Sequence, residues 1–457
     1  MLVQGLLQAK EQLLEKWIRV VGPVFHLHRQ GEAGSGRSAR SDVVHVQSIA
    51  SNRHTWHMSN VLPPSPAQSS RVLVLDRVRA EGPVSRVELA GHTGLTQASI
   101  SNLVKTLLAE GLLVETGERT YTGAKGKPRV LLGLNPQARY SIGVQLGADW
   151  IVMVLTDAAG TVMARTRMRG ARSTAPVRVV SAVATQIEAL LALSGVDRQL
   201  VAGIGLAVPG IIDLQTGAIL SSASLPLWEL FAVREALQKA TGLLTLVDNV
   251  ATAAVMGDYW SGAIPEASAH CTLYMGASIN TGLLIDGTVY RGASSNTGLL
   301  GRASFERAAG GRATVEEVAG PRAVAARARQ ELAAGRQTIA VLDDPANPFA
   351  DFAAIASAAV HGDSLALELI EESAQHIATV VVAMVNILDL DSVTLAGPSL
   401  STAGSLYLTQ IRDRISAEAL SAPKHDVTVR LSAQVTDAAS VGAAALMLQH
   451  SLAKPAG

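Results

Sequence analysis

The side chains best suited to contact another molecule lie between Ser85 and Leu134, where the spacing predicts a helix-turn-helix. Gly94 permits a sharp turn, and the Thr96 hydroxyl stands where a helix N-cap is expected, because it can accept a bond from an unpaired backbone N–H. Apolar residues then recur at helical spacing from Ile100 to Leu108. The opposite side carries small or polar residues that can approach base edges in a DNA major groove. These predicted base contacts are Gln97, Ala98, Ser101, Asn102 and Lys105.

A second group of residues is suited to holding the DNA backbone. Lys125-Gly126-Lys127-Pro128-Arg129 is a basic, glycine-containing tip between two segments of alternating polarity, which predicts a β-ribbon wing aimed at phosphate. The predicted backbone contacts are Ser85, Arg86, Thr96, Ser99, Lys125, Lys127 and Arg129. From Ser70 to Leu134 the sequence has nine Lys or Arg and six Asp or Glu. This small positive excess favours a few specific contacts with DNA over binding that ignores the DNA sequence. A surface helical hairpin without a DNA partner is the alternative interpretation.

Length and composition limit the remaining possibilities. The 457 residues are enough for two or three domains, and the formal charge is zero, so any nucleic-acid binding must be local. The single cysteine, Cys271, excludes an internal disulfide and any site that needs two thiolates from one chain, which favours a reducing cytoplasm. The most apolar run, Thr379–Leu390, is interrupted by Asn386 and Asp389 and is too short to span a bilayer, so no membrane association is expected.

The first 69 residues differ in composition from the rest. They contain five of the eleven histidines, a Gly/Ser/Arg stretch and a Pro-rich segment, and we expect residues 1–69 to form a disordered extension. Scattered histidines without a metal are the favoured interpretation, and a metal site on these histidines is the alternative. Met58 would make an ordinary start for the domain that follows, and a chain beginning there is expected to keep its stability. An amphipathic helix over residues 1–21 is the alternative.

From Tyr140 onward the pattern alternates between strands and helices, which predicts an α/β class. Three strands are expected from Ser141 to Met168, a helix over Val177–Leu193, and a strand ending at Asp248 and Asn249. The pattern further predicts a helix pair over His361–Leu390 and a closing helix near the C-terminus. The predicted domains are a winged helix over 70–136 and a domain over 137–457. The latter divides into one lobe over 137–250 plus the C-terminal helix and a second over 251–430.

Several motifs resemble those of the ROK family of repressors, open reading frames and sugar kinases. The similarity extends from Val72 to Leu448 and rests on the winged-helix segment, on GIGLAVPGIID at Gly203–Asp213, and on GTVYRGASSNTGLLG at Gly287–Gly301. The chain resembles the repressor branch, which includes the xylose repressors. The resemblance implies two actin-like lobes of the ribonuclease H type, assembled as homodimers or higher oligomers.

The chain departs from the kinases of this family at three motifs. Their E-N-D-A-N run, whose Asp is the general base, is Asp248-Asn249-Val250-Ala251-Thr252 here, and Val250 cannot accept a proton. Their first phosphate loop corresponds to Gln145–Trp150, which lacks the metal-binding Asp and the Lys, and their second to Gly276–Gly282, which lacks inner glycines. Because phosphoryl transfer needs base, metal and phosphate cradle together, we expect no catalytic residue and no kinase activity.

The sugar and zinc motifs of the family are altered as well. The A-G-E-x-G-H turn corresponds to Thr297–Arg302, where Leu299 cannot hydrogen-bond and Arg302 is a cation. The cysteine-rich zinc motif corresponds to Ala309–Thr314 and holds no cysteine, so no metal is expected. The remaining candidates for ligand binding are Asp248, Asn249, Glu316 and Arg302. Polar groups retained only for the scaffold are an equally weighted alternative.

These features favour a transcriptional regulator, a repressor that binds double-stranded operator DNA and responds to a sugar or sugar-derived effector. No cofactor is expected. The alternatives are a sugar kinase with a DNA-binding appendage and a pseudo-kinase regulator controlled by a protein partner.

Overall fold

A computed structural model describes residues 66–120, 129–262, 264, 269–306, 310–342, 347–421 and 423–454. The chain divides into two units, Met1–Leu62 and Pro63–Gly457. The expectations for residues 1–65, and those for Lys125, Lys127 and Ala309, lie outside the described residues.

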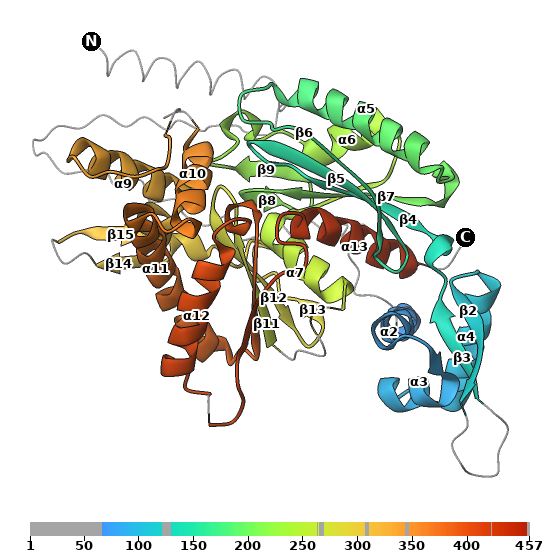
Figure 1. The fold of residues 1–457 in the computed structure, drawn as a ribbon. Helices are drawn as coiled ribbons and strands as arrows, with labels where there is room; N and C mark the ends of the chain where they lie inside the picture. Colours follow the sequence, from blue (N-terminus) through green and yellow to red (C-terminus); the bar gives the residue numbers. More distant parts are fainter. Residues whose placement is uncertain are drawn as a thin grey trace, which may run out of the picture. The chain divides into compact units, whose positions relative to one another are not determined.

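The first folded part is a winged helix. It comprises α2 (Pro66–Glu81), β1 (Val84–Ser85), α3 (Arg86–Thr93), α4 (Gln97–Ala109), β2 (Leu113–Thr120) and β3 (Arg129–Leu134), with an antiparallel sheet in the order β1-β3-β2 (Figure 1). Leu89, Ile100, Val104 and Leu107 are fully buried in its core. The predicted helix-turn-helix and the two paired strands of the wing are therefore confirmed.

The turn between α3 and α4 follows from local chemistry. Gly94 ends α3 in the left-handed region at φ 67°, which glycine adopts without steric cost, and Thr96 begins α4 as its N-cap. The Thr96 hydroxyl accepts a bond from the Ser99 N–H at 3.2 Å, as predicted. Only Leu89 of the eight residues of α3 is buried, and Val87 on the same helix is 43% exposed.

The first α/β lobe contains a five-stranded sheet in the order β10-β7-β4-β5-β6. Its strands are β4 (Tyr140–Gln145), β5 (Trp150–Asp157), β6 (Val162–Arg169), β7 (Val201–Val208) and β10 (Thr245–Asn249). β4, β7 and β10 run parallel, whereas β5 and β6 form an antiparallel meander with β4. One face is covered by α5 (Pro176–Ser194) and α6 (Val233–Thr241), and a hairpin of β8 (Ile211–Asp213) and β9 (Ala218–Ser221) follows β7.

The second lobe also contains a five-stranded sheet, in the order β13-β12-β11-β16-β17. Its strands are β11 (Ala269–Met275), β12 (Ile279–Ile285), β13 (Thr288–Val289), β16 (Ser392–Ala396) and β17 (Thr428–Leu431). The helices that build its core are α8 (Val315–Ala319), α9 (Pro321–Ala333), α10 (Pro348–Val360), α11 (Ser364–Leu388) and α12 (Gly404–Glu418). A small hairpin of β14 (Ser304–Glu306) and β15 (Arg312–Thr314) precedes α8.

The expected helix pair over His361–Leu390 is wrong. This segment holds one continuous helix, α11, and the preceding helix α10 ends before it, at Val360. The break is made by Gly362, at φ 84°, and by Asp363, whose carboxylate caps α11 by accepting a bond from the Ala366 N–H at 2.8 Å. The chain bends by 109° between the two helices.

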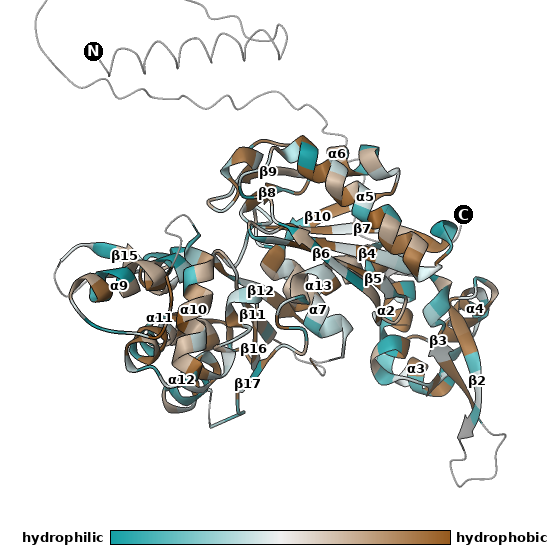
Figure 2. Ribbon diagram, turned by 45° about the horizontal axis from the view of Figure 1, so that its top comes forward, coloured by the Kyte–Doolittle hydropathy of each residue, from teal (hydrophilic) through white to brown (hydrophobic). Residues whose placement is uncertain are grey.

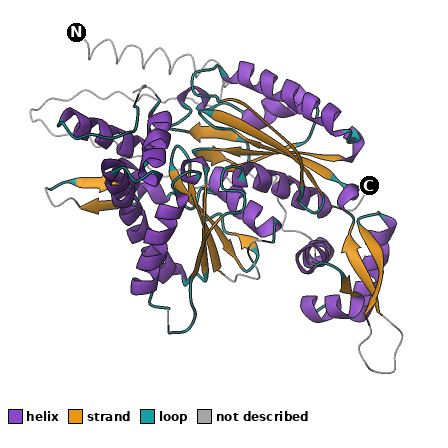
Figure 3. Cartoon of the chain, viewed as in Figure 1, coloured by secondary structure: helices purple, strands orange, loops and turns teal. Residues whose placement is uncertain are grey.

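Two helices lie between the sheets and hold the lobes together, as Figures 1 and 3 show: α7 (Val250–Trp260) and the C-terminal α13 (Ala438–Leu452). Their backbones approach closely where both carry glycine, since a Cβ added to Gly442 would lie 1.6 Å from the Ala253 oxygen. Almost every residue of α7 is buried. The architecture of two α/β lobes behind a winged helix is the one predicted.

Among the described helices, α5 alone is long and apolar enough by itself to cross a bilayer, and the bent pair α10–α11 passes the same test only when counted together. The coloring of Figure 2 shows brown apolar segments on both elements. Val180, Val183 and Ile187 of α5 pack against the first sheet, as in the core helix of a globular protein.

Candidate nucleic-acid interface and ligand cleft

The exposed side of α4 carries all five predicted base contacts. Ile100, Val104 and Leu107 turn toward the winged-helix core, and this fixes the opposite side of the helix outward. Gln97, Ala98, Ser101, Asn102 and Lys105 are all exposed. Their positions recur at intervals of about one helical turn, so they form one continuous surface. A helix with such a surface can enter the major groove of DNA. That they contact DNA stays a prediction.

The residues predicted to hold the DNA backbone fall into different environments. Arg86 lies 3.4 Å from Glu115, and Arg129 lies 3.9 Å from Glu88; each guanidinium remains about one-third exposed. Ion pairs of this kind are weak and can exchange for a phosphate. Ser99 is exposed beside Thr96, and their hydroxyl oxygens are 2.9 Å apart.

Ser85 requires a correction. It is only 2% exposed and forms a capping box at the start of α3, in which its hydroxyl oxygen accepts from the Glu88 N–H and the Glu88 carboxylate accepts from the Ser85 N–H. The Glu88 carboxylate also accepts a bond from the Ser85 hydroxyl at 2.7 Å. The bonds that this carboxylate accepts lower the pKa of Glu88, the one from the Ser85 backbone N–H most of all. The Ser85 side chain therefore serves the helix and is not available to DNA.

In the first lobe, the predicted ligand residues Asp248 and Asn249 lie at the carboxyl end of β10, where clefts form in open α/β sheets. Asn249 caps α7: its side-chain oxygen accepts from the Ala251 N–H and its amide donates to the Gly210 oxygen, both at 2.9 Å. Both ends of this amide are thus used within the protein, which supports a scaffold role for Asn249.

Asp248 is paired with a residue that the sequence patterns did not single out. Its carboxylate accepts a bond from the Arg291 guanidinium at 2.6 Å and another from the Asn249 N–H at 2.8 Å. Burial raises the pKa of Asp248, and the Arg291 charge opposes this rise. Arg291 follows β13 within the matched hairpin, and a basic residue in that motif was the only signal available.

Next to Asp248 and Asn249, the position that holds the general base in the kinases of the family carries an apolar residue here. Val250 is 4% exposed and occupies the first turn of α7 within an apolar cluster. At the end of β4, the side-chain oxygen of Gln145 is buried with no hydrogen-bond partner among the described residues. The carboxyl ends of β4 and β10 therefore offer a neutral acceptor on Gln145 and the ion pair of Asp248 with Arg291. The Val250 position offers no group able to take a proton from a sugar hydroxyl.

Glu316 and Arg302 form a second polar group, in the second lobe. Glu316, on α8, has its pKa raised by burial, while a hydrogen bond with Ser278 and the charges of Arg302 and Arg322 act in the opposite direction. A Cβ at Gly301 would lie 2.8 Å from a Glu316 carboxylate oxygen, so the turn before Arg302 lies directly against Glu316. The structure therefore brings Glu316 and Arg302 together, and separately joins Asp248 with Asn249.

The zinc motif of the family corresponds to the β14–β15 hairpin. Within the residues that the structure describes, no group of three or more His, Cys, Asp or Glu is placed to hold a metal ion. Cys271 is buried in β11, and burial raises the pKa of its thiol to about 12, so it is a poor thiolate ligand at neutral pH.

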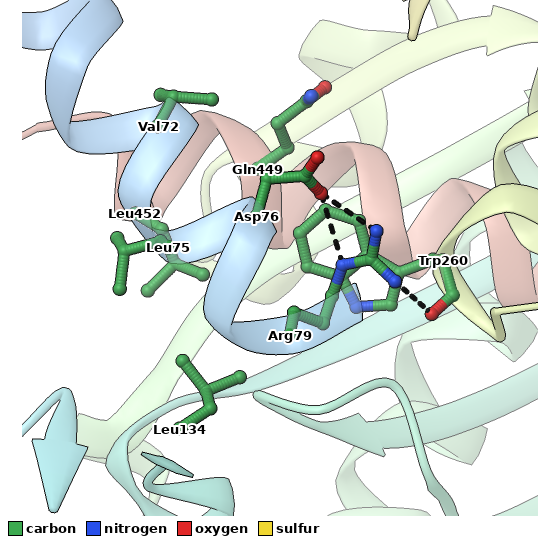
Figure 4. Close-up of a pocket in the computed structure, with 8 residues that line it drawn as sticks. All are labelled: Val72, Leu75, Asp76, Arg79, Leu134, Trp260, Gln449 and Leu452. Carbon is green, nitrogen blue, oxygen red and sulfur yellow. Dashed lines mark hydrogen bonds and ion pairs between the residues drawn. The ribbon is translucent and has the colours of Figure 1, made fainter. Parts of the chain in front are cut away.

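The winged helix contacts the lobes at what we call the Arg79 junction, which is formed by Asp76, Arg79, Tyr259 and Trp260. Figure 4 shows Asp76, Arg79 and Trp260 of this junction. The Arg79 side chain is 4% exposed; it donates to Asp76 at 2.7 Å and to the Trp260 carbonyl at 2.6 Å. Its guanidinium also lies 4.6 Å from the Trp260 ring centroid and 5.0 Å from that of Tyr259, while the Tyr259 hydroxyl donates to Asp76. Because Tyr259 and Trp260 end α7, one helix connects this junction with Asn249 at the end of β10.

Comparison with known proteins agrees with this arrangement. The model of the ROK family matches residues 141–450. The xylose repressor of Caldicellulosiruptor bescii is 26% identical over 394 residues, which cover 85% of this chain and 97% of the repressor. The crystal structure of a ROK family transcriptional regulator, a homologue of the Escherichia coli MLC protein, superposes with a TM-score of 0.66 at 21% identity, covering 85% of this chain and 96% of that one.

A glucokinase from Streptomyces griseus, solved with glucose and AMPPNP, superposes with a TM-score of 0.58 at 22% identity. It covers 67% of this chain and 98% of its own. The shared part therefore has the actin-like fold of the sugar kinases, as predicted, and the regulator covers a larger share of this chain than the kinase does.

Proposed function

We propose that this chain, which belongs to the ROK family, is a sequence-specific DNA-binding transcriptional regulator that represses its target genes and responds to a sugar or a sugar-derived effector. The observation that carries the proposal is the exposed polar side of α4, held outward by the winged-helix core. The repressor and the regulator structure match nearly their whole lengths to this chain, which supports the same conclusion.

The wing and the start of α4 would hold the DNA backbone. The residues of the first turn of α4, Gln97, Ala98 and Ser99, are exposed, and an exposed helix N-terminus attracts phosphate. Arg86 and Arg129 lie on the same domain and would exchange their weak carboxylate partners for phosphate. One winged helix presents one recognition helix, so a palindromic site requires two copies, and we propose a homodimer acting in the cytoplasm.

The response to an effector would travel along α7. This helix of 11 residues spans about 16 Å, from the Asn249 cap at the cleft to Trp260 at the Arg79 junction. It packs on α13 with backbone contact at Gly257 and Gly442, so a displacement at one end moves both helices rather than bending one. α13 also reaches the winged helix, since the Arg71 side chain donates to the Leu452 carbonyl at 2.7 Å.

Phosphoryl transfer is proposed to be lost. The lobes share the fold of a glucokinase, but the position of the general base holds Val250, which is buried and apolar. The candidate ligand residues Asp248, Asn249, Glu316 and Arg302 would then recognise an effector without chemistry. The pairing of Asp248 with Arg291 adds Arg291 to this set.

The test is selection of genomic DNA fragments by the purified full chain, with and without a panel of sugars and sugar derivatives. Enrichment of a palindromic sequence, reduced by at least one member of the panel, is the expected result. The matched control is a Gln97→Ala/Asn102→Ala double variant, which should fold normally and select nothing, because both side chains are exposed. Fragments recovered without any shared sequence would contradict the proposal.

A further inference from the structure

A cavity of about 200 Å³ lies where the winged helix, the first lobe and the end of α13 meet. It is far larger than the roughly 10–15 Å³ that one water molecule needs, yet smaller than the roughly 300–1,000 Å³ of pockets for drug-sized ligands. Its lining is Arg71, Glu110, Leu112, Arg139, Ala202, Leu244, Met447, His450, Ser451, Leu452 and Lys454. We call it the basic cavity, because four of its five ionisable side chains are basic.

Only one of the basic groups is neutralised by a carboxylate. Arg71, 5% exposed, forms a two-point ion pair with Glu110, which uses up the one acidic side chain of the lining. The guanidinium of Arg139 has the carbonyl of Ala138 as its hydrogen-bond partner, at 2.8 Å. No ion pair of Arg139, His450 or Lys454 with a carboxylate occurs within the described parts of the chain. Arg139, which is half-buried, and Lys454, which is exposed, therefore bring two fixed positive charges to the lining of this cavity without a carboxylate partner among the described residues.

His450 adds a third group that can become positive. It is partly buried, and burial, followed by the charge of Lys454, lowers its pKa. The charged or titratable groups around it are Arg71, Glu110, Arg139 and Lys454. An anion placed among them would offset the Lys454 charge and favour the protonated imidazole.

We propose that the basic cavity is a binding site for a small phosphate-bearing ligand, held by Arg139, Lys454 and His450. A doubly charged phosphate matches the two uncompensated cations, whereas a single carboxylate would leave one of them unpaired. Leu112, Leu244 and Met447 form an apolar wall for a short carbon chain. This site is separate from the sugar cleft at Asp248, and it does not depend on the proposed DNA binding.

The position of the site gives it a regulatory consequence. Its lining comes from α2, from the segment after α4, from the linker before β4 and from the end of α13, which are the parts that join the winged helix to the lobes. A ligand bound there would bridge these parts and stabilise the winged helix in its docked position.

The experiment is calorimetric titration of the full-length protein with inorganic phosphate, glycerol 3-phosphate and acetate, in the absence of DNA. One phosphate-bearing ligand should bind per chain, and acetate should bind more weakly. Arg139→Gln and Lys454→Gln should each weaken binding about tenfold or more, because each removes a charge-assisted contact. Lys239→Gln, on the exposed side of α6, removes the same charge elsewhere and should leave the affinity unchanged.

The outcomes separate the possible sources of the phosphate. Tighter binding of glycerol 3-phosphate than of inorganic phosphate supports a phosphorylated metabolite, and equal binding supports inorganic phosphate. Absence of saturable binding, preference for acetate, or equal weakening by all three variants would overturn the proposal. Because no DNA is present, a failure here is distinct from a failure of the proposed regulator function.

A second readout tests His450 directly. Sulfate does not titrate near neutral pH, so proton uptake on sulfate binding, measured from the dependence of the heat on the buffer, reports the imidazole. The wild type should take up protons and His450→Gln should not. Equal uptake by both proteins would overturn the role assigned to His450.

Discussion

Replacing Arg79 with alanine should loosen the winged helix from the lobes and weaken its response to the effector. The substitution removes the hydrogen bonds from the guanidinium to Asp76 and to the Trp260 carbonyl, and also its contacts with two aromatic rings. Removing one partner of a buried ion pair costs about 3–5 kcal/mol, and contacts between a cation and an aromatic ring contribute up to about 2 kcal/mol when desolvated. Asp76 is 21% exposed and keeps the Tyr259 hydroxyl as a donor, so we expect a cost near the lower limit, about 3 kcal/mol.

The assay is hydrogen exchange of the backbone amides of α2 and of the last turn of α7. A loss of about 3 kcal/mol in docking corresponds to exchange about 100-fold faster in these segments. Operator affinity should persist, since α4 is untouched. The ratio of operator affinities without and with effector, expected within about 5–150-fold for a coupled regulator, should fall toward one.

Arg329→Ala is the matched control. Arg329 forms an ion pair with the buried Asp351 between α9 and α10, in the second lobe, so its loss should cost a similar free energy away from the winged helix. Unchanged exchange in α2 of the Arg79 variant, or an equal loss of effector response in both variants, would refute the idea that the Arg79 junction connects the lobes to the DNA-binding domain.

Four further outcomes are expected. Asn102→Ala should weaken specific DNA binding by roughly 1–3 kcal/mol while Lys127→Ala should weaken all sequences alike, as competition titrations with operator and scrambled DNA would show. Magnesium-ATP should not be consumed with glucose, N-acetylglucosamine, N-acetylmannosamine or fructose, and turnover above that of a Val250→Lys variant would contradict this. Elemental analysis after dialysis should find no stoichiometric zinc, and one zinc per chain would show a site that the cysteine pattern does not reveal. Burial raises the pKa of the Asp258 carboxyl to about 6. The contribution of this group to the free energy of unfolding is therefore full below its unfolded pKa of about 4, and it is lost as the pH rises through about 6. Asp258→Asn should therefore raise the melting temperature more near pH ~7.5 than near pH ~4.5, and an equal effect at both would contradict that assignment.

The recognition helix was predictable because its signals are local. Gly94 and Thr96 define the turn and the cap, and the periodicity from Ile100 onward defines the buried side, so the exposed side of α4 follows directly. Ser85 was misassigned although a local signal existed, since Ser85 and Glu88 have the spacing of a capping box. A serine that caps a helix is occupied by backbone N–H groups and is not free for phosphate.

The error in the second lobe has a similar cause. Gly362 and Asp363 mark a break near the start of His361–Leu390, but this break separates α10 from α11, and nothing interrupts α11 after it. Because Asp363 is the N-cap of α11, all the periodic apolar residues that follow it belong to one helix.

The pairs that join distant segments could not be predicted. Arg79 and Trp260 are 181 residues apart, and Asp248 and Arg291 are 43 apart. Neither pair leaves a periodic or spacing signal, because each depends on how whole lobes pack. The motifs indicated that Asp248 and Asn249 end a strand, but only the hydrogen bonds show that Asn249 caps α7.

The central claim, that the exposed side of α4 reads a DNA sequence, is tested most directly by one ratio of affinities. Anisotropy titrations would measure binding of the full chain to its selected sequence and to a scrambled duplex of equal length, at the same salt concentration. Specific regulators bind their sites about 10³–10⁷-fold more tightly than other DNA, and the structure predicts a ratio in this range that collapses in Asn102→Ala. Equal affinities for the two duplexes, or a ratio that the Asn102 substitution leaves unchanged, would contradict the account.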